Sequence, residues 1–154
     1  MQRGRGCYDG AVPVKPRKLF LNLPISNLKR SVDFFTALGF SFDPRFTSEN
    51  ATCMILNDEA FVMLLEEDFF KSFHKKDIAD PNRQMEAIMA ISADSRADVD
   101  DLVDKALAAG ATSSKPADDH GFMYQRTFQD LDGHHWEVVW MEMAAFEQLA
   151  KQSG

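Results

Sequence analysis

Apolar residues along the chain form two similar series of strand-like runs, each interrupted by one helix-like stretch. In the first series, an apolar run predicts a strand at residues 18–23, which Pro24 ends because proline cannot donate to a strand ladder. Apolar residues three and four positions apart predict a helix over residues 28–38. Further apolar runs predict strands at residues 40–42, 51–56 and 60–65.

The second series repeats this order of elements. It begins with a predicted strand at residues 87–91, followed by a helix through residues 99–107. A short strand is predicted at residues 111–114, before a polar loop. The next strand covers residues 123–128, and a turn over residues 130–133 leads into the last strand of the series.

Both predicted helices have polar residues at the start and a glycine at the end. Ser26 or Asn27 can cap the first helix, and Ser95 begins a capping box before the second. Gly39 and Gly110 suit the left-handed position that ends a helix. The repeated pattern predicts an α+β fold built by internal duplication from two tandem βαβββ modules.

The boundaries of these modules follow from the breaks in the pattern. Charged residues, a proline and an amphipathic stretch between the two series indicate a linker with a short helix. The predicted segments are a flexible leader at 1–16, a first module at 17–66, the linker at 67–84, a second module at 85–141, and a C-terminal helix or tail at 142–154.

The last predicted strand contains the most unusual residue of the chain. Strand alternation places His135 and Glu137 on one face and Trp136 and Val138 on the other. A carboxylate in such an apolar run needs a partner, a metal or a proton if it faces the interior. Glu137 is therefore a candidate metal ligand, general base or buried acid, and equally a carboxylate that its neighbours merely satisfy.

Antiparallel pairing about the turn adds two polar residues to this face. If the turn is centred near Asp132, Thr127 lies opposite Glu137 and Gln125 lies opposite Val139. These two side chains are candidates to contact a ligand.

Composition and charge exclude several classes of function. The 154 residues are 45% hydrophobic, which suits one compact domain or two small fused modules. A formal net charge of −7 argues against nucleic acid, and no apolar stretch approaches the roughly 20 residues of a membrane span. Cys7 and Cys53 do not suggest a disulfide framework, so we expect a reducing, cytoplasmic environment.

The paired modules and the segment Asp-Leu-Asp-Gly-His-His-Trp-Glu-Val at residues 130–138 resemble the vicinal oxygen chelate superfamily. Its members include glyoxalase I, extradiol dioxygenases, fosfomycin-resistance enzymes and bleomycin-resistance proteins. The sequence Gly-Phe-Met-Tyr at residues 121–124 is most similar to glyoxalase and bleomycin-resistance-like proteins of bacteria. This resemblance implies curved mixed sheets that form a U-shaped cavity, and it implies a homodimer.

The resemblance also implies four positions for metal ligands, two in each module. They fall on Phe20, Met63, Ile88 and Glu137, of which only Glu137 can bind a hard cation. Because one carboxylate does not hold a catalytic ion, we expect no standard divalent metal site and no cofactor. The alternative metal site consists of Glu137 and His135 on their shared face with His120 from the polar loop.

The function implied is binding of a small organic molecule, by sequestration or with a reaction that the sequence leaves open. Glu137 is the catalytic candidate, and the predicted pocket residues are Phe20, Asn22, Met63, Ile88, His120, Gln125, Thr127 and His135. One alternative is a metal-dependent lyase, dioxygenase or thiol transferase with an atypical ligand set. A second is a dimerisation scaffold with a vestigial cavity.

Overall fold

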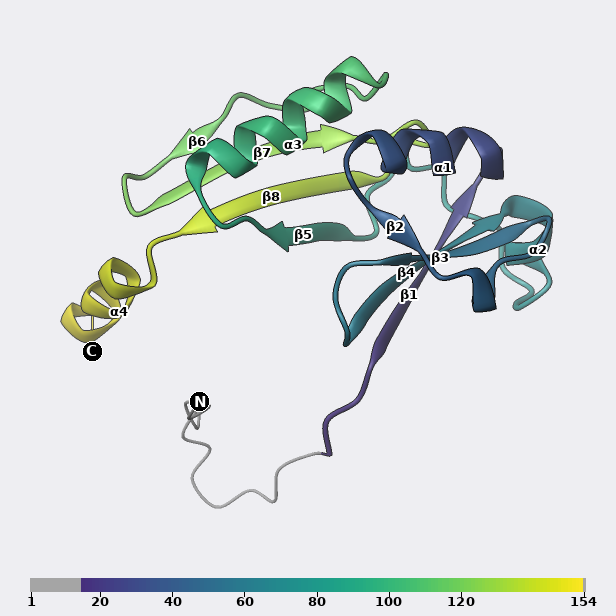
Figure 1. The fold of residues 1–154 in the computed structure, drawn as a ribbon, viewed down its shortest axis with the longest axis horizontal. Helices are drawn as coiled ribbons and strands as arrows, with labels where there is room; N and C mark the ends of the chain where they lie inside the picture. Colours follow the sequence, from purple (N-terminus) through teal and green to yellow (C-terminus); the bar gives the residue numbers. More distant parts are fainter. Residues whose placement is uncertain (1–14, 154) are drawn as a thin grey trace.

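The computed structural model describes residues 15–153, and it contains two modules of the same topology (Figure 1). The first module consists of β1 (Leu19–Ile25), α1 (Leu28–Ala37), β2 (Ser41–Phe42), a 3-10 helix η1 (Pro44–Phe46), β3 (Ala51–Ile55) and β4 (Ala60–Glu66). The second consists of β5 (Ile88–Ser92), α3 (Arg96–Ala108), β6 (Asp118–Asp119), β7 (Met123–Gln129) and β8 (His135–Met141). Helix α2 (Glu67–Lys71) follows β4 directly, and α4 (Met143–Gln152) follows β8.

Each module forms its own four-stranded mixed sheet. The strand order is β1-β4-β3-β2 in the first sheet, called sheet A, and β5-β8-β7-β6 in the second, called sheet B. In both sheets the first strand runs parallel to the fourth, and the other neighbouring pairs are antiparallel. The predicted α+β fold with duplicated βαβββ topology is confirmed.

The helix caps form as the sequence predicts. The side chain of Asn27 accepts a hydrogen bond from the backbone N–H of Arg30 at the start of α1. At the start of α3, Ser95 accepts from the backbone N–H of Asp98. The chain leaves the two helices through Gly39 and Gly110, whose φ angles of 99° and 109° favour glycine.

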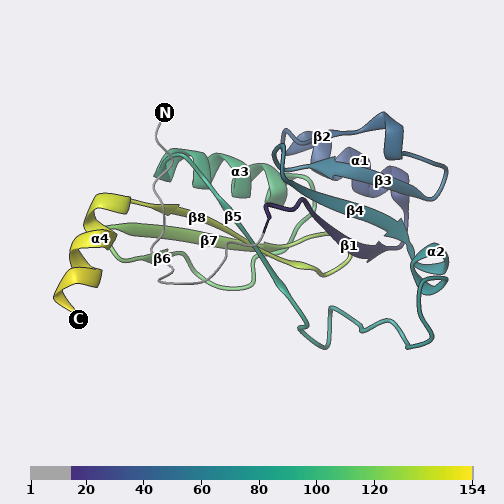
Figure 2. The same ribbon diagram turned by 90° about the horizontal axis from the view of Figure 1, so that it is seen from below.

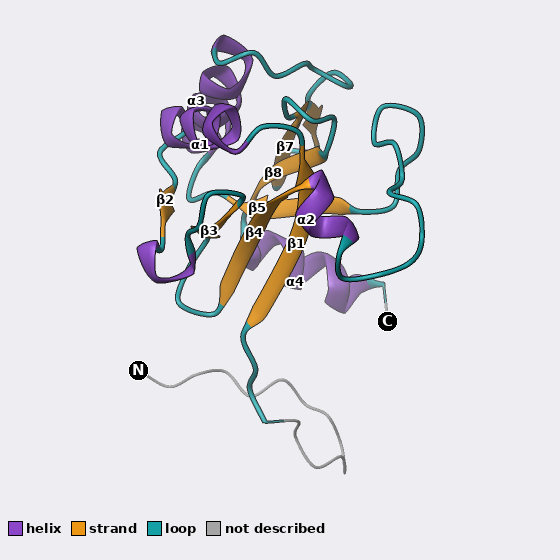
Figure 3. Cartoon of the chain, turned by 90° about the vertical axis from the view of Figure 1, so that its right-hand side faces the viewer, coloured by secondary structure: helices purple, strands orange, loops and turns teal. Residues whose placement is uncertain are grey.

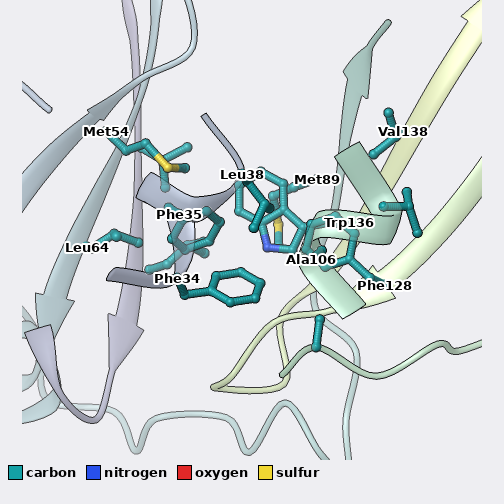
Figure 4. Close-up of a cluster of buried hydrophobic side chains, with 14 of the residues drawn as sticks. Phe34, Phe35, Leu38, Met54, Leu64, Met89, Ala106, Phe128, Trp136 and Val138 are labelled. Carbon is teal, nitrogen blue, oxygen red and sulfur yellow. The ribbon is translucent and has the colours of Figure 1, made fainter. Parts of the chain in front are cut away.

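The two modules share one hydrophobic core. Helices α1 and α3 lie side by side (Figures 1 and 3), and each covers one face of its own sheet. Phe34 and Phe35 of α1 reach across to the second module, with ring centroids 6.3 Å from Phe128 and 5.5 Å from Trp136, respectively (Figure 4). Aromatic contacts therefore bind the first helix to the second sheet.

The register of sheet B matches the sequence prediction. Thr127 lies opposite Glu137, and Gln125 lies opposite Val139. Trp136 and Val138 are buried in the core, on the face that α3 covers. His135 and Glu137 consequently lie on the other face, which we call the open face of sheet B.

The turn before β8 links the modules through its two aspartates. Asp130 is buried and accepts hydrogen bonds from the backbone N–H groups of Asp132 and His134 and from the indole N–H of Trp136, each at 3.0 Å. Asp132 reaches the start of α1, where it accepts from Ser26, Arg30 and Ser31. The turn is thus fixed both to its own strand and to the other module.

Two local predictions were wrong. Pro24 does not end the first strand but lies within β1, because β1 is at the edge of sheet A and pairs with β4 alone. Residues 111–114 form only an isolated bridge between Thr112 and Gln129. The short strand of this region is β6, inside the expected polar loop.

The segment between α2 and β5 passes from the first module to the second along one side of the molecule (Figure 2). Helix α4 lies beyond sheet B, away from sheet A (Figures 1 and 2). Most of the predicted leader lies outside the described residues. Between residues 15 and 153, no helix is long and apolar enough to cross a membrane.

Candidate functional site

Glu137 is half-buried on the open face of sheet B, where its side chain retains 19% exposure. Its carboxylate Oε1 lies 3.5 Å from Nε2 of His135, which precedes it by two residues and points to the same side of the strand. Thr127 faces it from β7, and Ala90 faces it from β5. A carboxylate beside an imidazole can hold or exchange a proton, so the pair is chemically competent for acid–base work.

The segment that leads to β6 adds two polar groups that the sequence did not suggest. The hydroxyls of Ser114 and Thr127 lie 2.8 Å apart. Lys115 forms a 2.6 Å ion pair with Asp118. The hydrogen bond to Asp118 and, further away, the charge of Glu137 raise the pKa of Lys115. Lys115 therefore brings a positive charge towards Glu137.

His120 follows β6 and is exposed. Its loop is held by Arg96, which donates two hydrogen bonds to the carboxylate of Asp119 and one to the carbonyl of Gly121. The hydrogen bonds from Arg96 hold the pKa of Asp119 well below its usual range. The hydrogen bonds from Arg96 thus hold the loop that carries His120. The ring of His120 lies beside Phe122, with a centroid separation of 6.4 Å.

A cavity of about 360 Å³ lies at the junction of the two modules. Its walls come from β1, from the start of β5, from His134 in the turn before β8, and from His135 at the start of β8. Residues between α2 and β5, which we call the strap (residues 72–87), line its outer side. The apolar lining includes Leu21, Leu23, Phe70, Ile78, Met85 and Met89.

The cavity contains only part of the predicted pocket. Asn22 and His135 line it. Phe20 and Met63 lie with Asn22 on the outer face of sheet A, opposite the face that α1 covers. The remaining predicted residues of sheet B, which are Ile88, Gln125, Thr127 and Glu137, lie on its open face. The structure thus separates the predicted residues into two sheet faces and the junction between them.

Sequence reasoning did not place the strap or His134 at the cavity. His134 is buried, lines the cavity and makes a 2.7 Å hydrogen bond through Nε2 with the carbonyl of Pro24. His74 is exposed and lines the mouth of the cavity with its ring against Phe70. The only signal available was the aromatic content of the linker, since an irregular segment has no periodicity that reveals its contacts.

Comparison with known proteins identifies the family. The family profile of the Glyoxalase/Bleomycin resistance protein/Dioxygenase superfamily matches residues 19–138, which covers both modules. The chain belongs to this superfamily. No curated protein matches the chain.

Several solved structures share the fold of this member of the superfamily. A hypothetical protein SA1046 from S. aureus is 24% identical, with a TM-score of 0.69 over 80% of this chain and 92% of the other. A glyoxalase-related enzyme from Fulvimarina pelagi is 20% identical, with a TM-score of 0.67 over 79% and 85%. TioX from Micromonospora sp. ML1 is 19% identical, with a TM-score of 0.57 over 80% and 98%. At these identities the likeness concerns the fold alone.

The side chains of this glyoxalase-superfamily member do not fit the metal site expected from its relatives. Phe20, Met63 and Ile88, on which the family resemblance places three of the four ligands, offer no donor for a hard cation. Among residues 15–153, no three His, Cys, Asp or Glu side chains are grouped so that they could hold a metal ion. In this arrangement His120 is not grouped with His135 and Glu137.

Proposed function

We propose that this protein binds a small organic molecule in the cavity between its two modules, without a resident divalent metal. The observation that carries the proposal is the cavity itself, which has an apolar lining, a few polar groups and an outer wall formed by the strap. Its volume of about 360 Å³ lies within the range of about 300–1,000 Å³ typical of small-molecule sites.

Binding of indole, followed through backbone amide shifts, tests this proposal with two matched alanine variants. Ala87 lines the cavity, whereas Ala90 lies on the open face of sheet B beside Glu137. We expect Ala87→Trp to weaken binding by about tenfold or more, because its ring fills the site. Ala90→Trp should bind as the unmodified protein does. Loss of binding in Ala90→Trp alone would move the site to the open face.

A protein that works without a metal should purify without one. We expect elemental analysis to find far less than one ion per chain after soaking in zinc, nickel, manganese or iron(II), since only Glu137 of the four family positions offers a ligand. Indole binding should also survive a chelator. Close to one ion per chain, lost in Glu137→Gln, would instead support the metal-dependent lyase, dioxygenase or thiol transferase alternative.

We further propose that the chain forms a homodimer through the outer face of sheet A and the open face of sheet B. Phe20 on sheet A is 44% exposed and stacks on Phe61 with a centroid separation of 5.0 Å. Ile88 on sheet B is 51% exposed. Exposed apolar residues on the faces where the family builds its sites are suited to contact a second copy.

A further inference from the structure

The outer edge of β1 carries backbone groups that the sheet does not use. Because β1 pairs with β4 alone, every second residue directs its N–H and C=O away from the sheet. The N–H of Leu19 donates to the carbonyl of Glu59, so the odd-numbered residues of β1 face β4. Phe20, Asn22 and Pro24 therefore present their backbone groups at the free edge of β1.

Two carbonyls of this edge already have partners. The side chain of Asn22 donates to the carbonyl of Phe20 at 3.0 Å. The carbonyl of Pro24 is hydrogen-bonded to Nε2 of His134 at 2.7 Å, and proline has no N–H. Between these two positions, the backbone N–H and C=O of Asn22 have no hydrogen-bond partner among residues 15–153.

The cavity between the modules lies along this edge. Four consecutive residues of β1, at positions 21–24, line it, although neighbouring residues of a strand point to opposite faces. A cavity that contacts both faces lies beside an edge, and β4 occupies the other edge of β1. His134, which meets the carbonyl of Pro24 at the free edge, lines the same cavity. The unpaired N–H and C=O of Asn22 therefore border the cavity.

The neighbouring groups limit what can pair with this edge to a single residue. The next N–H on this side of the chain belongs to Ser26 and donates to Asp132. The carbonyls of Phe20 and Pro24 also have partners. An added polypeptide strand, from another protein or from a second copy, needs several such groups in a row. One amino-acid unit needs only the pair on Asn22, since two antiparallel residues can exchange both hydrogen bonds.

The rest of the lining indicates that this unit is uncharged and has an apolar side chain. Leu21, Leu23 and Met89 contribute apolar surface beside the edge. Among the described residues of the wall, none that is buried is a carboxylate, a lysine or an arginine. A free amine or carboxylate on the ligand would lose hydration with no buried counter-charge to replace it. Both ends of the unit are therefore blocked, as in an amide.

We infer that the cavity selects a neutral amino-acid derivative, blocked at both ends, that pairs with the free edge of β1 at Asn22. The ligand carbonyl accepts from the backbone N–H of Asn22, and the ligand N–H donates to the backbone carbonyl. This inference rests on the proposed function, since it names the chemical class of the ligand for the same cavity. It makes the backbone of Asn22 the group that orients the ligand.

Two probes test this inference, N-acetylleucine N′-methylamide and its analogue methylated on the leucine nitrogen, which lacks the N–H to be donated. We expect the unmodified protein to bind the first probe about fivefold more tightly, the effect of one hydrogen bond made in competition with water. The first probe should also slow hydrogen exchange of the Asn22 N–H. It should leave exchange unchanged at Phe20, which lies on the same edge outside the cavity.

Proline variants of the two edge strands give a matched comparison. Asn22→Pro should bind the first probe about fivefold more weakly than Asn22→Ala, because only the proline removes the backbone N–H. Its pairing with β4 should survive, as it does at Pro24. On β5, the hydrogen bond from Ala93 to Val139 directs Ala90 to the free edge, outside the cavity. Ala90→Pro should bind the probe as the unmodified protein does.

The outcomes separate this inference from the proposed function. Equal affinity of the two probes, or unchanged exchange of the Asn22 N–H, would overturn the inference while indole binding in the cavity stays intact. Protection of this N–H in the ligand-free protein would also overturn it, because another partner, such as a second copy, would already occupy the edge. Failure of indole and both probes to bind, or binding unaffected by Ala87→Trp, would overturn the proposed function itself.

Discussion

At the scale of single residues, Asp130 is a buried carboxylate of the second module that depends on hydrogen-bond donors from its own turn and strand. It is buried and accepts from two backbone N–H groups and one indole N–H. Its carboxylate therefore holds the geometry of the turn and the position of Trp136 together. Removal of the acceptor would leave buried donors without partners, which is more harmful than loss of an exposed hydrogen bond.

We expect Asp130→Ala to lower the free energy of unfolding by about 3 kcal/mol, because several donors lose their acceptor at once. Asp130→Asn, which keeps one oxygen, should lose roughly half as much. Urea denaturation measures both values, and the exposed Asp58→Ala serves as the control. Equal stability of Asp130→Ala and the unmodified protein would show that water satisfies these donors.

Asp100 provides a pH-dependent contribution to stability. Hydrogen bonds from the hydroxyl of Tyr124 and from Arg126 hold the pKa of Asp100 below its usual range. Its contribution to the free energy of unfolding is therefore complete above the pKa of aspartate in unfolded chains, about 4. This contribution is lost as the pH falls through the lower pKa of Asp100 in the folded protein.

We expect the free energy of unfolding to decrease below about pH 4, and this decrease to be shallower in Asp100→Asn. The effect should be small, because the Asp100 side chain is 47% exposed and solvent screens it. Urea unfolding at a series of pH values measures the slope. An identical slope in both proteins would assign the acid sensitivity to other carboxylates.

At the scale of elements, the turn at residues 130–133 and the start of α1 act as one unit. Asp132 is 10% exposed and accepts from Ser26, Arg30 and the buried Ser31. This places a carboxylate of the second module at the positive end of a helix in the first. The contact complements the aromatic packing between α1 and sheet B.

We expect Asp132→Ala to destabilise the protein by about 2 kcal/mol, since it removes charge-assisted hydrogen bonds at a nearly buried site. Asp33→Ala is the matched control on α1, because Asp33 makes only an exposed pair with Lys29 and should change stability by less than about 0.5 kcal/mol. Thermal and urea unfolding measure the difference. Equal effects of the two changes would mean that the turn is not fixed to α1 through Asp132.

The sequence was most informative about elements whose pattern repeats. Alternation and turn geometry together predicted the pairing of Thr127 with Glu137, because a strand has a fixed period and a tight turn fixes the register. The role of Asp132 could not be predicted, since an aspartate in a turn fits many local structures and its partners lie 101 to 106 positions away. A cavity was predicted, but the strap could not be predicted as part of its wall, because an irregular segment has no periodicity that reveals its contacts.

At the scale of the whole molecule, the two sheets carry apolar residues on faces that a single chain leaves partly exposed. Phe20 and Ile88 belong to different modules, so a symmetric pair of chains could bring each face against its counterpart or against the other module. The proposed dimer would remove both residues from water.

We expect sedimentation equilibrium to show a dimer for the unmodified protein and a shift towards monomer for Phe20→Lys and Ile88→Glu, because a charge at a buried contact is unfavourable. Phe73→Lys is the control, since Phe73 is 65% exposed and lies in the strap. A monomeric unmodified protein, or a dimer that survives both changes, would contradict the use of these faces.

The contact between Asp132 and α1 also bears on the order in which the protein acquires its structure during synthesis. The ribosome releases the first module long before residues 132–135, which complete the start of α1 and one wall of the cavity. The first module therefore lacks the hydrogen bonds from Ser26 to Asp132 until the second module has been synthesised. A chain interrupted before this turn would lack both the Asp132 carboxylate at the start of α1 and one wall of the cavity.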